Sequence, residues 1–373
     1  MAFLSSLTAE ASRVLADPSL AAFVGQLGGA VEAYVAATAK GGAAFIAGPA
    51  QATFGVCLLA AYSCYQYNVW TTWWSAVDRC WSVLPAVYAL IYALWPLLAG
   101  AGAIDARLAL MAALVTLWGA RLTYNFARKG GYSPGVESED YRWPILRAFF
   151  KAHDPTHPLG EQLFSLLFVA LYQQILIWLF VVPPFFVAAR HAATPLGATD
   201  ALLAVAFLAL LAGETWADEA QFAFQKAKHA MSPAERERAG GDFARGFLSS
   251  TAPFTYSRHL NFFCEQSLWV VIYLFSWSAG AELLNWSGFG AALLISLFQG
   301  STWMTELVSA QKYPAYKAYQ QTTSRLMPWF AGPSLDAPAG KLILKNKAAA
   351  ADGAAVAASG ASKRRKSIGG KRE

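Results

Sequence analysis

Charge is what this sequence has least of. Only 14% of its 373 residues are Asp, Glu, Lys or Arg, whereas a soluble domain usually has about a quarter. Aromatic residues are plentiful instead, with 14 Trp, 15 Tyr and 24 Phe. This combination argues against an ordinary soluble protein and predicts a polytopic membrane protein.

Cysteine and histidine are scarce and scattered. The four cysteines form no CxxC pair, and the five histidines form neither an HExxH motif nor an i, i+4 pair, so we expect no disulfide framework and no metal site. Residues 1–50 are Ala-rich without a basic start followed by a compact apolar run, which is not the pattern of a cleaved signal peptide. No nucleic-acid-binding module is recognisable, so nucleic acid is not an expected partner.

Apolar runs long enough to cross a bilayer, about 20 residues, recur along the chain. They lie near 50–67, 81–100, 104–121, 161–189, 199–216, 266–282 and 288–308. Pro183 and Pro184 are expected to end or kink the fourth run, and residues 20–48 are candidates for an extra amphipathic or re-entrant helix. The predicted fold is all-α, a polytopic transmembrane helical bundle of about seven to eight spans.

Positive charge is concentrated at the C-terminal end. The net charge is +6, but residues 341–373 hold nine Lys or Arg against Asp352 and Glu373, which leaves the other residues at −1. This Ala-, Gly- and Ser-rich tail is predicted to be disordered. Its basic cluster at 363–366 suits a solubilising cytosolic tail, a contact with anionic lipid or a targeting signal. The predicted organisation is an Ala-rich N-terminal segment at 1–48, N-terminal spans at 49–103, a membrane domain at 104–332 and a disordered basic tail at 333–373.

Three stretches between the expected helices carry most of the remaining positive charge. Stretch 120–160 has six Lys or Arg, stretch 217–265 has six and stretch 310–330 has three. Two expected helices separate each stretch from the next, so all three are predicted to face the cytosol by the positive-inside rule. With seven spans the N-terminal end lies on the side of the membrane opposite to the cytosol. An eighth span near 20–45 would put the N-terminal end in the cytosol.

The first of these stretches, RLTYNFARKGGYSPGVESEDYRW, combines arginines, glycines and acidic residues. Arg121, Tyr124 and Arg128 lie at helical spacing, and Gly130 and Gly131 are predicted to end the helix. Arginines beside glycines suit nucleotide phosphates, because guanidinium binds phosphate bidentately. An ordinary cytosolic loop with internal ion pairs has the same composition, so this stretch alone leaves both interpretations open.

In the second stretch, GETWADEAQFAFQKAK, four polar residues share one face if the segment is helical. They are Glu214, Asp218, Gln221 and Gln225. A carboxylate such as Glu214 at the end of an apolar run is costly unless it faces a wet or paired interior. The neighbouring Glu219, Lys226 and Lys228 are expected to be a solvated continuation of the helix.

Two further polar groups leave alternatives open. Tyr313, Tyr316 and Tyr319 suit either an interfacial aromatic belt or a ligand site. Gln173 and Gln174 interrupt the fourth apolar run, where polar side chains either hold helices together or contact a substrate.

Four stretches taken together resemble the steroid 5α-reductase superfamily, in its branch with a reductase-like C-terminal domain. They are RKGGYS…SEDYRW (128–143), ETWADEAQFAFQ (214–225), RGFLSS…FTYSRHLNFFCEQ (245–266) and TELVSAQKYPAYKAYQ…PWF (305–330). The resemblance covers about residues 105–330, and the motifs follow in the family's order.

The resemblance implies a membrane reductase, in the endoplasmic reticulum with a cytosolic C-terminal tail, that uses NADPH to reduce a conjugated C=C bond in a steroid- or prenyl-like lipid. The lipid enters from the bilayer, and the cofactor binds on the cytosolic side. The cofactor-binding positions it implies are Arg128, Asp140, Arg142, Asp218, Tyr256, Arg258, His259, Asn261, Glu265, Lys312, Tyr313 and Tyr316. It assigns no proton donor and therefore no catalytic residue.

Two other functions are compatible with the same stretches. Isoprenylcysteine carboxyl methyltransferases look like relatives in the last region and bind S-adenosylmethionine. A non-catalytic lipid-binding membrane protein is suggested by Leu260 and Cys264, which stand where the reductase motif usually has Pro and Gly. Proline is favoured at a first helical position, and glycine lets the backbone approach a ligand closely, so the Cys264 side chain is expected to crowd the cofactor.

Overall fold

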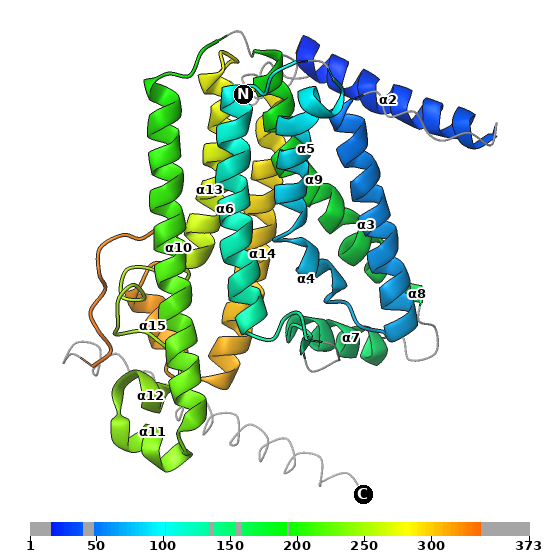
Figure 1. The fold of residues 1–373 in the computed structure, drawn as a ribbon. Coiled ribbons are helices and arrows are strands. Elements are labelled where there is room, and N and C mark those ends of the chain that lie inside the picture. Colours follow the sequence, from blue (N-terminus) through cyan, green and yellow to red (C-terminus); the bar gives the residue numbers. More distant parts are fainter. Residues whose placement is uncertain are drawn as a thin grey trace, which may run out of the picture. The chain divides into compact units, whose positions relative to one another are not determined.

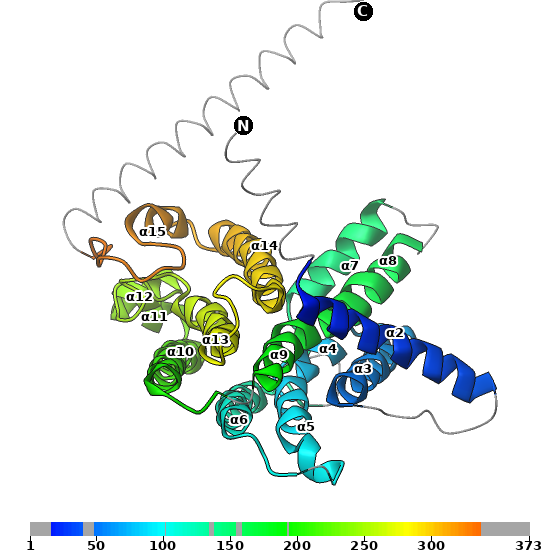
Figure 2. The same ribbon diagram turned by 90° about the horizontal axis from the view of Figure 1, so that it is seen from above.

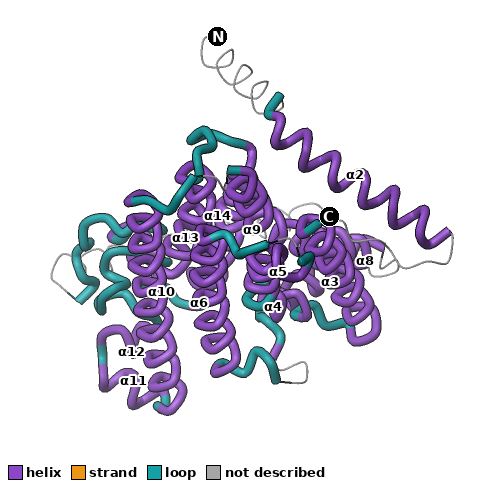
Figure 3. The backbone as a smooth tube through the Cα atoms, turned by 45° about the horizontal axis from the view of Figure 1, so that its top comes forward, coloured by secondary structure: helices purple, strands orange, loops and turns teal. Residues whose placement is uncertain are grey.

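The computed structural model describes residues 16–39, 48–100, 102–133, 138–153, 159–191 and 194–336. Within these ranges every regular element is a helix and none is a strand (Figure 3), which confirms the all-α prediction. From residue 337 onwards, the tail that the sequence predicts to be disordered lies outside the described residues.

The helices, labelled in Figure 1, follow one another along the chain with short connections. They are α2 (Pro18–Ala39), α3 (Pro49–Thr71), α4 (Ala76–Cys80), α5 (Leu84–Leu98), α6 (Ala106–Arg128), α7 (Arg142–His153), α8 (Leu159–Phe164), the π-helix η2 (Ser165–Tyr172), α9 (Gln173–Arg190), α10 (Ala198–Ala230), α11 (Pro233–Ala239), α12 (Gly241–Arg245), α13 (Leu260–Ser278), the 3₁₀-helix η3 (Trp286–Gly288), α14 (Phe289–Lys312) and α15 (Tyr316–Thr322).

Each of the seven predicted apolar runs overlaps a helix, but among the described residues only four helical segments are both long and apolar enough to cross a membrane. They are Ala76–Leu98, Ala106–Arg128, Leu159–Arg190 and Ala198–Ala230. The predicted count of seven to eight spans is therefore not confirmed. The other long helices carry polar side chains within or directly beside their apolar runs, such as Asn68 in α3, Glu265 in α13 and Glu306 in α14.

The chain divides into two units, the first comprising residues 1–211 and 266–297 and the second residues 212–265 and 298–373. In the first unit α9 packs against α3 and α5, and α5 also packs against α6 (Figure 2). The interior is aromatic, with Trp178, Phe180 and Phe185 almost fully buried.

A buried ion pair fixes one end of the first unit. The Arg107 guanidinium at the start of α6 lies 2.8 Å from Asp200 at the start of α10, and both side chains are 2% exposed. Arg107 also donates to the carbonyls of Thr194 and Pro195. A charge so deeply buried is stable only when paired and hydrogen-bonded, and this arrangement meets both conditions.

Pro183 and Pro184 do not end the fourth apolar run, because α9 continues through both prolines to Arg190. A proline at position 183 leaves the carbonyl of Leu179 without its helical donor. Gly290 of α14 packs directly on that carbonyl, since a Cβ at position 290 would lie only 2.1 Å from the Leu179 oxygen. Close packing of a neighbouring helix thus covers the interrupted stretch of α9.

The second unit holds the short helices α11, α12 and α15. Helix α11 begins with a capping box, in which the Ser232 hydroxyl accepts from the Glu235 amide while the Glu235 carboxylate accepts from the Ser232 amide. The apolar core of the second unit comprises Phe247, Tyr316, Ala318, Tyr319 and Leu335. Helices α10, α13 and α14 contribute residues to both units.

Candidate functional site

The candidate site is built around the segment that leads into α13. This segment is held by backbone hydrogen bonds, because the amides of Arg258 and His259 donate to the carbonyls of Ser324 and Arg325 at 2.9 and 3.1 Å. The Ser257 hydroxyl adds a bond of 2.6 Å to the Leu326 carbonyl. Two stretches almost 70 residues apart in sequence, 255–259 and 324–332, are therefore fixed side by side.

Glu306 of α14 is the centre of the polar cluster. Its carboxylate receives two bonds from the Arg258 guanidinium, at 2.6 and 3.1 Å, and one from the Gln320 amide at 2.9 Å. The His259 Nε2 atom lies 3.1 Å from the same carboxylate. All three charged or ionisable side chains are at most 10% exposed.

Arg258 is occupied on every side that the structure describes. Besides Glu306, its Nη1 atom donates to the carbonyls of Gln320 and Thr323. A guanidinium in a bidentate ion pair with two further acceptors has little capacity left for a phosphate. In this structure Arg258 and His259 both contact Glu306.

A second contact joins α10 to the first turn of α13. The Asn261 amide donates to the Asp218 carboxylate at 3.2 Å. Asp218 and Glu214 are both buried, at 6% and 4% exposure, and they occupy one face of α10 as the spacing predicts. Glu265, one turn beyond Asn261, is also buried at 8% exposure.

Lys228 continues this face of α10, contrary to the prediction that it is solvated. It follows Gln225 by three residues, is 5% exposed, and donates to the Gly246 carbonyl at 3.1 Å and the Tyr313 hydroxyl at 3.4 Å. Glu219 and Lys226 are exposed, as predicted. The sequence contains the signal that identifies Lys228. Glu214, Asp218, Gln221 and Gln225 follow one another at intervals of four, three and four residues, and a further interval of three leads to Lys228.

Two of the three tyrosines near the end of the chain are core residues instead of an interfacial belt. Tyr316 and Tyr319 are 6% and 2% exposed and pack around Phe247. The Tyr319 hydroxyl donates to the Phe254 carbonyl at 2.5 Å, and burial raises the pKa of this hydroxyl well above its usual value. Tyr313 is partly buried and stacks beside Phe247.

Three predicted ligands of the second unit are at least partly exposed. Lys312 is exposed at the end of α14, Tyr256 is 42% exposed, and Asn261 is partly exposed. An ammonium, a phenol and an amide in one unit are groups that hydrogen-bond phosphate or ribose oxygens.

A family model described as "Protein of unknown function (DUF1295)" matches residues 64–323. The chain belongs to the DUF1295 family. The matched region contains all the predicted site residues. The chain is also 35% identical, over 274 residues, to the protein C594.04c of Schizosaccharomyces pombe, which is described as uncharacterized; the match covers 72% of this chain and 76% of that protein. No solved structure matches the chain.

Three predicted site residues of this DUF1295 protein belong to the first unit and make their own contacts there. Arg128 donates to the Asn125 side chain at 3.0 and 2.8 Å, and α6 ends beside it because Gly130 has a φ of +82°. Asp140 and Arg142 form an ion pair at 2.7 Å, with side chains about 30% exposed. In the second unit the structure joins Asn261 to Asp218, and it joins Arg258 and His259 to Glu306, whereas Arg128, Asp140 and Arg142 lie in the first unit.

The two departures of this DUF1295 protein from the reductase motif have local explanations. Leu260 is the first residue of α13 and is 8% exposed, so it replaces the pre-organisation of a proline by apolar burial. The Cys264 thiol packs against α10, because a Cβ built on Gly213 would lie 3.2 Å from its sulfur. The missing Cβ of Gly213 in the neighbouring helix leaves room for this thiol.

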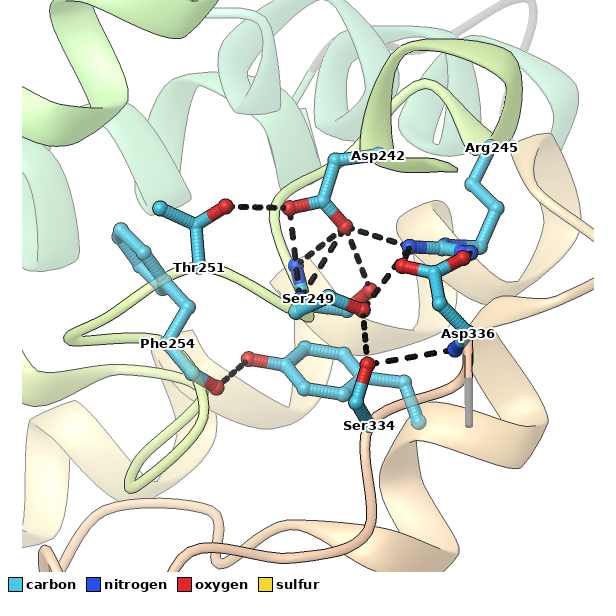
Figure 4. A network of polar contacts seen from close by, with 9 residues as sticks. Asp242, Arg245, Ser249, Thr251, Phe254, Ser334 and Asp336 are labelled. Carbon is cyan, nitrogen blue, oxygen red and sulfur yellow. Dashed lines mark hydrogen bonds and ion pairs between the residues drawn. The ribbon is translucent and has the colours of Figure 1, made fainter. Parts of the chain in front are cut away.

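One polar cluster near the site was missing from the sequence interpretation. The Asp242 carboxylate accepts hydrogen bonds from the Ser249 amide and hydroxyl and from the Thr251 hydroxyl, and it pairs with Arg245 (Figure 4). Arg245 also pairs with Asp336 at 2.6 Å. Burial alone would lower the pKa of the Arg245 guanidinium, but the hydrogen bonds to Asp336 and Asp242 raise it above its usual value. This cluster ties loop 246–254 to the segment at 334–336.

Within the described part of the chain, no three His, Cys, Asp or Glu side chains are placed to hold a metal ion.

Proposed function

We propose that this DUF1295 protein is a membrane-embedded reductase that uses NADPH to reduce a C=C bond conjugated to a carbonyl in a steroid- or prenyl-like lipid. One observation supports it above the others. Motif residues from distant segments are hydrogen-bonded to one another in the second unit, Arg258 and His259 to Glu306 and Asn261 to Asp218. These residues belong to the motifs, in the same order along the chain, on which the resemblance to the steroid 5α-reductase superfamily rests.

The donor set is compatible with a phosphate-bearing cofactor. When bound, NADPH supplies the hydride. In this proposal Lys312 and Tyr256 hold the polar parts of the nucleotide, because they are the exposed donors among the predicted ligands of the second unit, and the partly exposed Asn261 assists them. Arg258, His259 and Glu306 act as positioning residues, since they fix the start of α13 to the end of α14.

The proposal includes a membrane arrangement of seven or eight crossings. In this arrangement the four segments that are long and apolar enough to cross a membrane are four of the crossings, and α3, α13 and α14 are three more. Helix α2 is the eighth where there are eight. The three positively charged stretches and the C-terminal tail then face the cytosol, and the membrane is that of the endoplasmic reticulum, where NADPH and a lipid substrate are both accessible.

A binding titration tests the proposal. The purified full chain in detergent is titrated with NADPH while its tryptophan fluorescence is followed, and saturable binding is expected. Lys312→Ala should weaken binding about tenfold or more, because a hydrogen bond to a charged group contributes about 1.5–3 kcal/mol. Lys226→Ala is the matched control, since Lys226 is an exposed lysine of α10 outside the cluster. Arg258→Ala is unsuitable, because it also removes a buried ion pair.

The alternatives give different results in the same assay. S-adenosylmethionine binding without NADPH binding would indicate a methyltransferase of the isoprenylcysteine type. Binding of neither would indicate a non-catalytic lipid-binding protein. In that case Cys264→Gly should create NADPH affinity, whereas the reductase proposal expects unchanged affinity because the thiol packs against Gly213.

A further inference from the structure

A short segment of the second unit exposes three large apolar side chains. Met327 is 52% exposed, Trp329 64% and Phe330 84%. The four residues from Met327 to Phe330, MPWF, are called here the apolar tip. Three large exposed apolar side chains in four residues are unusual on a water-facing loop, and such clusters commonly mark an interaction surface.

The apolar tip is rigidly held at both ends. Before it, the Leu326 carbonyl accepts from the Ser257 hydroxyl at 2.6 Å. After it, the Gly332 amide donates to the Thr255 carbonyl at 3.2 Å, and Gly332 packs so closely on the Thr322 backbone that a Cβ there would lie 1.7 Å from the Thr322 oxygen. The fixed ends keep the tip beside residues 255–257.

Residues 255–261 lie level with the ends of two apolar helical runs. Asn261 bonds to Asp218, which follows the apolar run 199–216 of α10 by two residues, and α10 is long and apolar enough to cross a membrane. Arg258 bonds to Glu306, near the end of the run 288–308 of α14. The end of a spanning apolar run is the level of the lipid headgroups.

Exposed tryptophans mark the same level on both helices. Trp216 precedes Asp218 by two residues and is 51% exposed, and Trp303 precedes Glu306 by three and is 63% exposed. Tryptophan is enriched where a membrane meets water, because its ring is apolar and its N–H hydrogen-bonds to headgroups or water. Trp329 of the apolar tip has the same character.

We propose that the apolar tip is a membrane-interface anchor, which inserts Trp329 and Phe330 among the lipid headgroups and upper acyl chains. The anchor holds the segment 255–261, and with it the candidate site, at the bilayer surface. The inference rests on α10 crossing the membrane and not on the identity of a cofactor.

Photo-crosslinking tests this proposal. The full chain carrying p-benzoylphenylalanine in place of Phe330 is reconstituted in vesicles of phosphatidylcholine with a minority of phosphatidylserine, irradiated and examined by mass spectrometry. Lipid adducts are expected, several-fold above those of a control with the same probe in place of His229. His229 is an exposed residue of α10 that lies eleven positions beyond Asp218, about 16 Å further along the axis.

Each other result would overturn the proposal. Adducts to a second copy of the chain would make the tip a protein interface, and adducts no more frequent than at His229 would place it in water. The probe at position 329 should give the same result as at 330, so that one poorly folded variant does not decide the outcome. Because no nucleotide is added, failure here is distinct from failure of the reductase proposal.

Discussion

Arg258 shows how burial decides what a charged residue contributes to the fold. Its guanidinium is 7% exposed and joins Glu306 to two backbone carbonyls. Removing one partner of a buried pair leaves the other charge without compensation, which costs far more than breaking an exposed pair. Burial therefore separates the stabilising ion pairs of this protein from those that contribute little.

The substitution Glu306→Gln should destabilise the protein strongly, by about 3–5 kcal/mol, because Arg258 would remain buried without its counter-charge. Asp336→Asn is the matched control in the same unit. Asp336 is 46% exposed and its partner Arg245 keeps Asp242, so the expected loss is below about 1 kcal/mol. Thermal unfolding in detergent measures both. Equal shifts for the two variants would show that the Glu306 cluster is not a stabilising element.

The residues that share one face of α10 could be predicted from the sequence, but the contacts between distant segments could not. The spacing of the polar residues along α10 correctly placed Glu214 and Asp218 on one face. Following the same spacing one interval further along the helix would have included Lys228. The partner of Arg258 is 48 residues away, and no local pattern identifies Glu306 as its acceptor. Asp242 was missed because its donors are backbone amides and hydroxyls, which nearly every loop contains.

At the level of helices, α9 shows where composition misleads. Two consecutive prolines predicted an end or a kink, and the helix does not end there but continues to Arg190. In α14, Gly290 packs onto the Leu179 carbonyl that Pro183 leaves without a helical donor. Sequence periodicity predicted where the helices are, but this close packing depends on a residue more than a hundred positions away.

Gly290→Ala should destabilise the first unit by about 1–3 kcal/mol, the usual cost of overpacking, because the new Cβ would meet backbone and not a movable side chain. Gly300→Ala is the control in the same helix. Position 300 has no atom within 4 Å of a built Cβ, so alanine there should be neutral or stabilising by about 0.5–1 kcal/mol. Unfolding midpoints in detergent provide the comparison, and a Gly290→Ala protein as stable as the parent would refute the close packing.

For the whole molecule, the proposed topology rests on the distribution of positive charge. Six Lys or Arg in 120–160, six in 217–265 and three in 310–330 are separated each time by two helices. Short loops rich in Lys and Arg stay on the cytosolic side during insertion. The polar cluster of the second unit draws on the second and third of these stretches, so a cytosolic cofactor can reach it only if both face the same compartment.

A glycosylation map tests this arrangement. Acceptor sequences on flexible linkers, inserted one at a time after residues 135, 239 and 331, should remain unmodified when the chain is expressed in eukaryotic cells, because the proposed arrangement puts those positions on the cytosolic side. The same insert after residue 193 or 284 should be glycosylated, since the proposal puts these positions, where positive charges are few, on the lumenal side. An insert ahead of α2 then distinguishes seven crossings, which would leave it modified, from eight, which would not. Modification at any one of the three positively charged stretches would separate the motif residues across the membrane, and a single cytosolic cofactor could no longer contact them all.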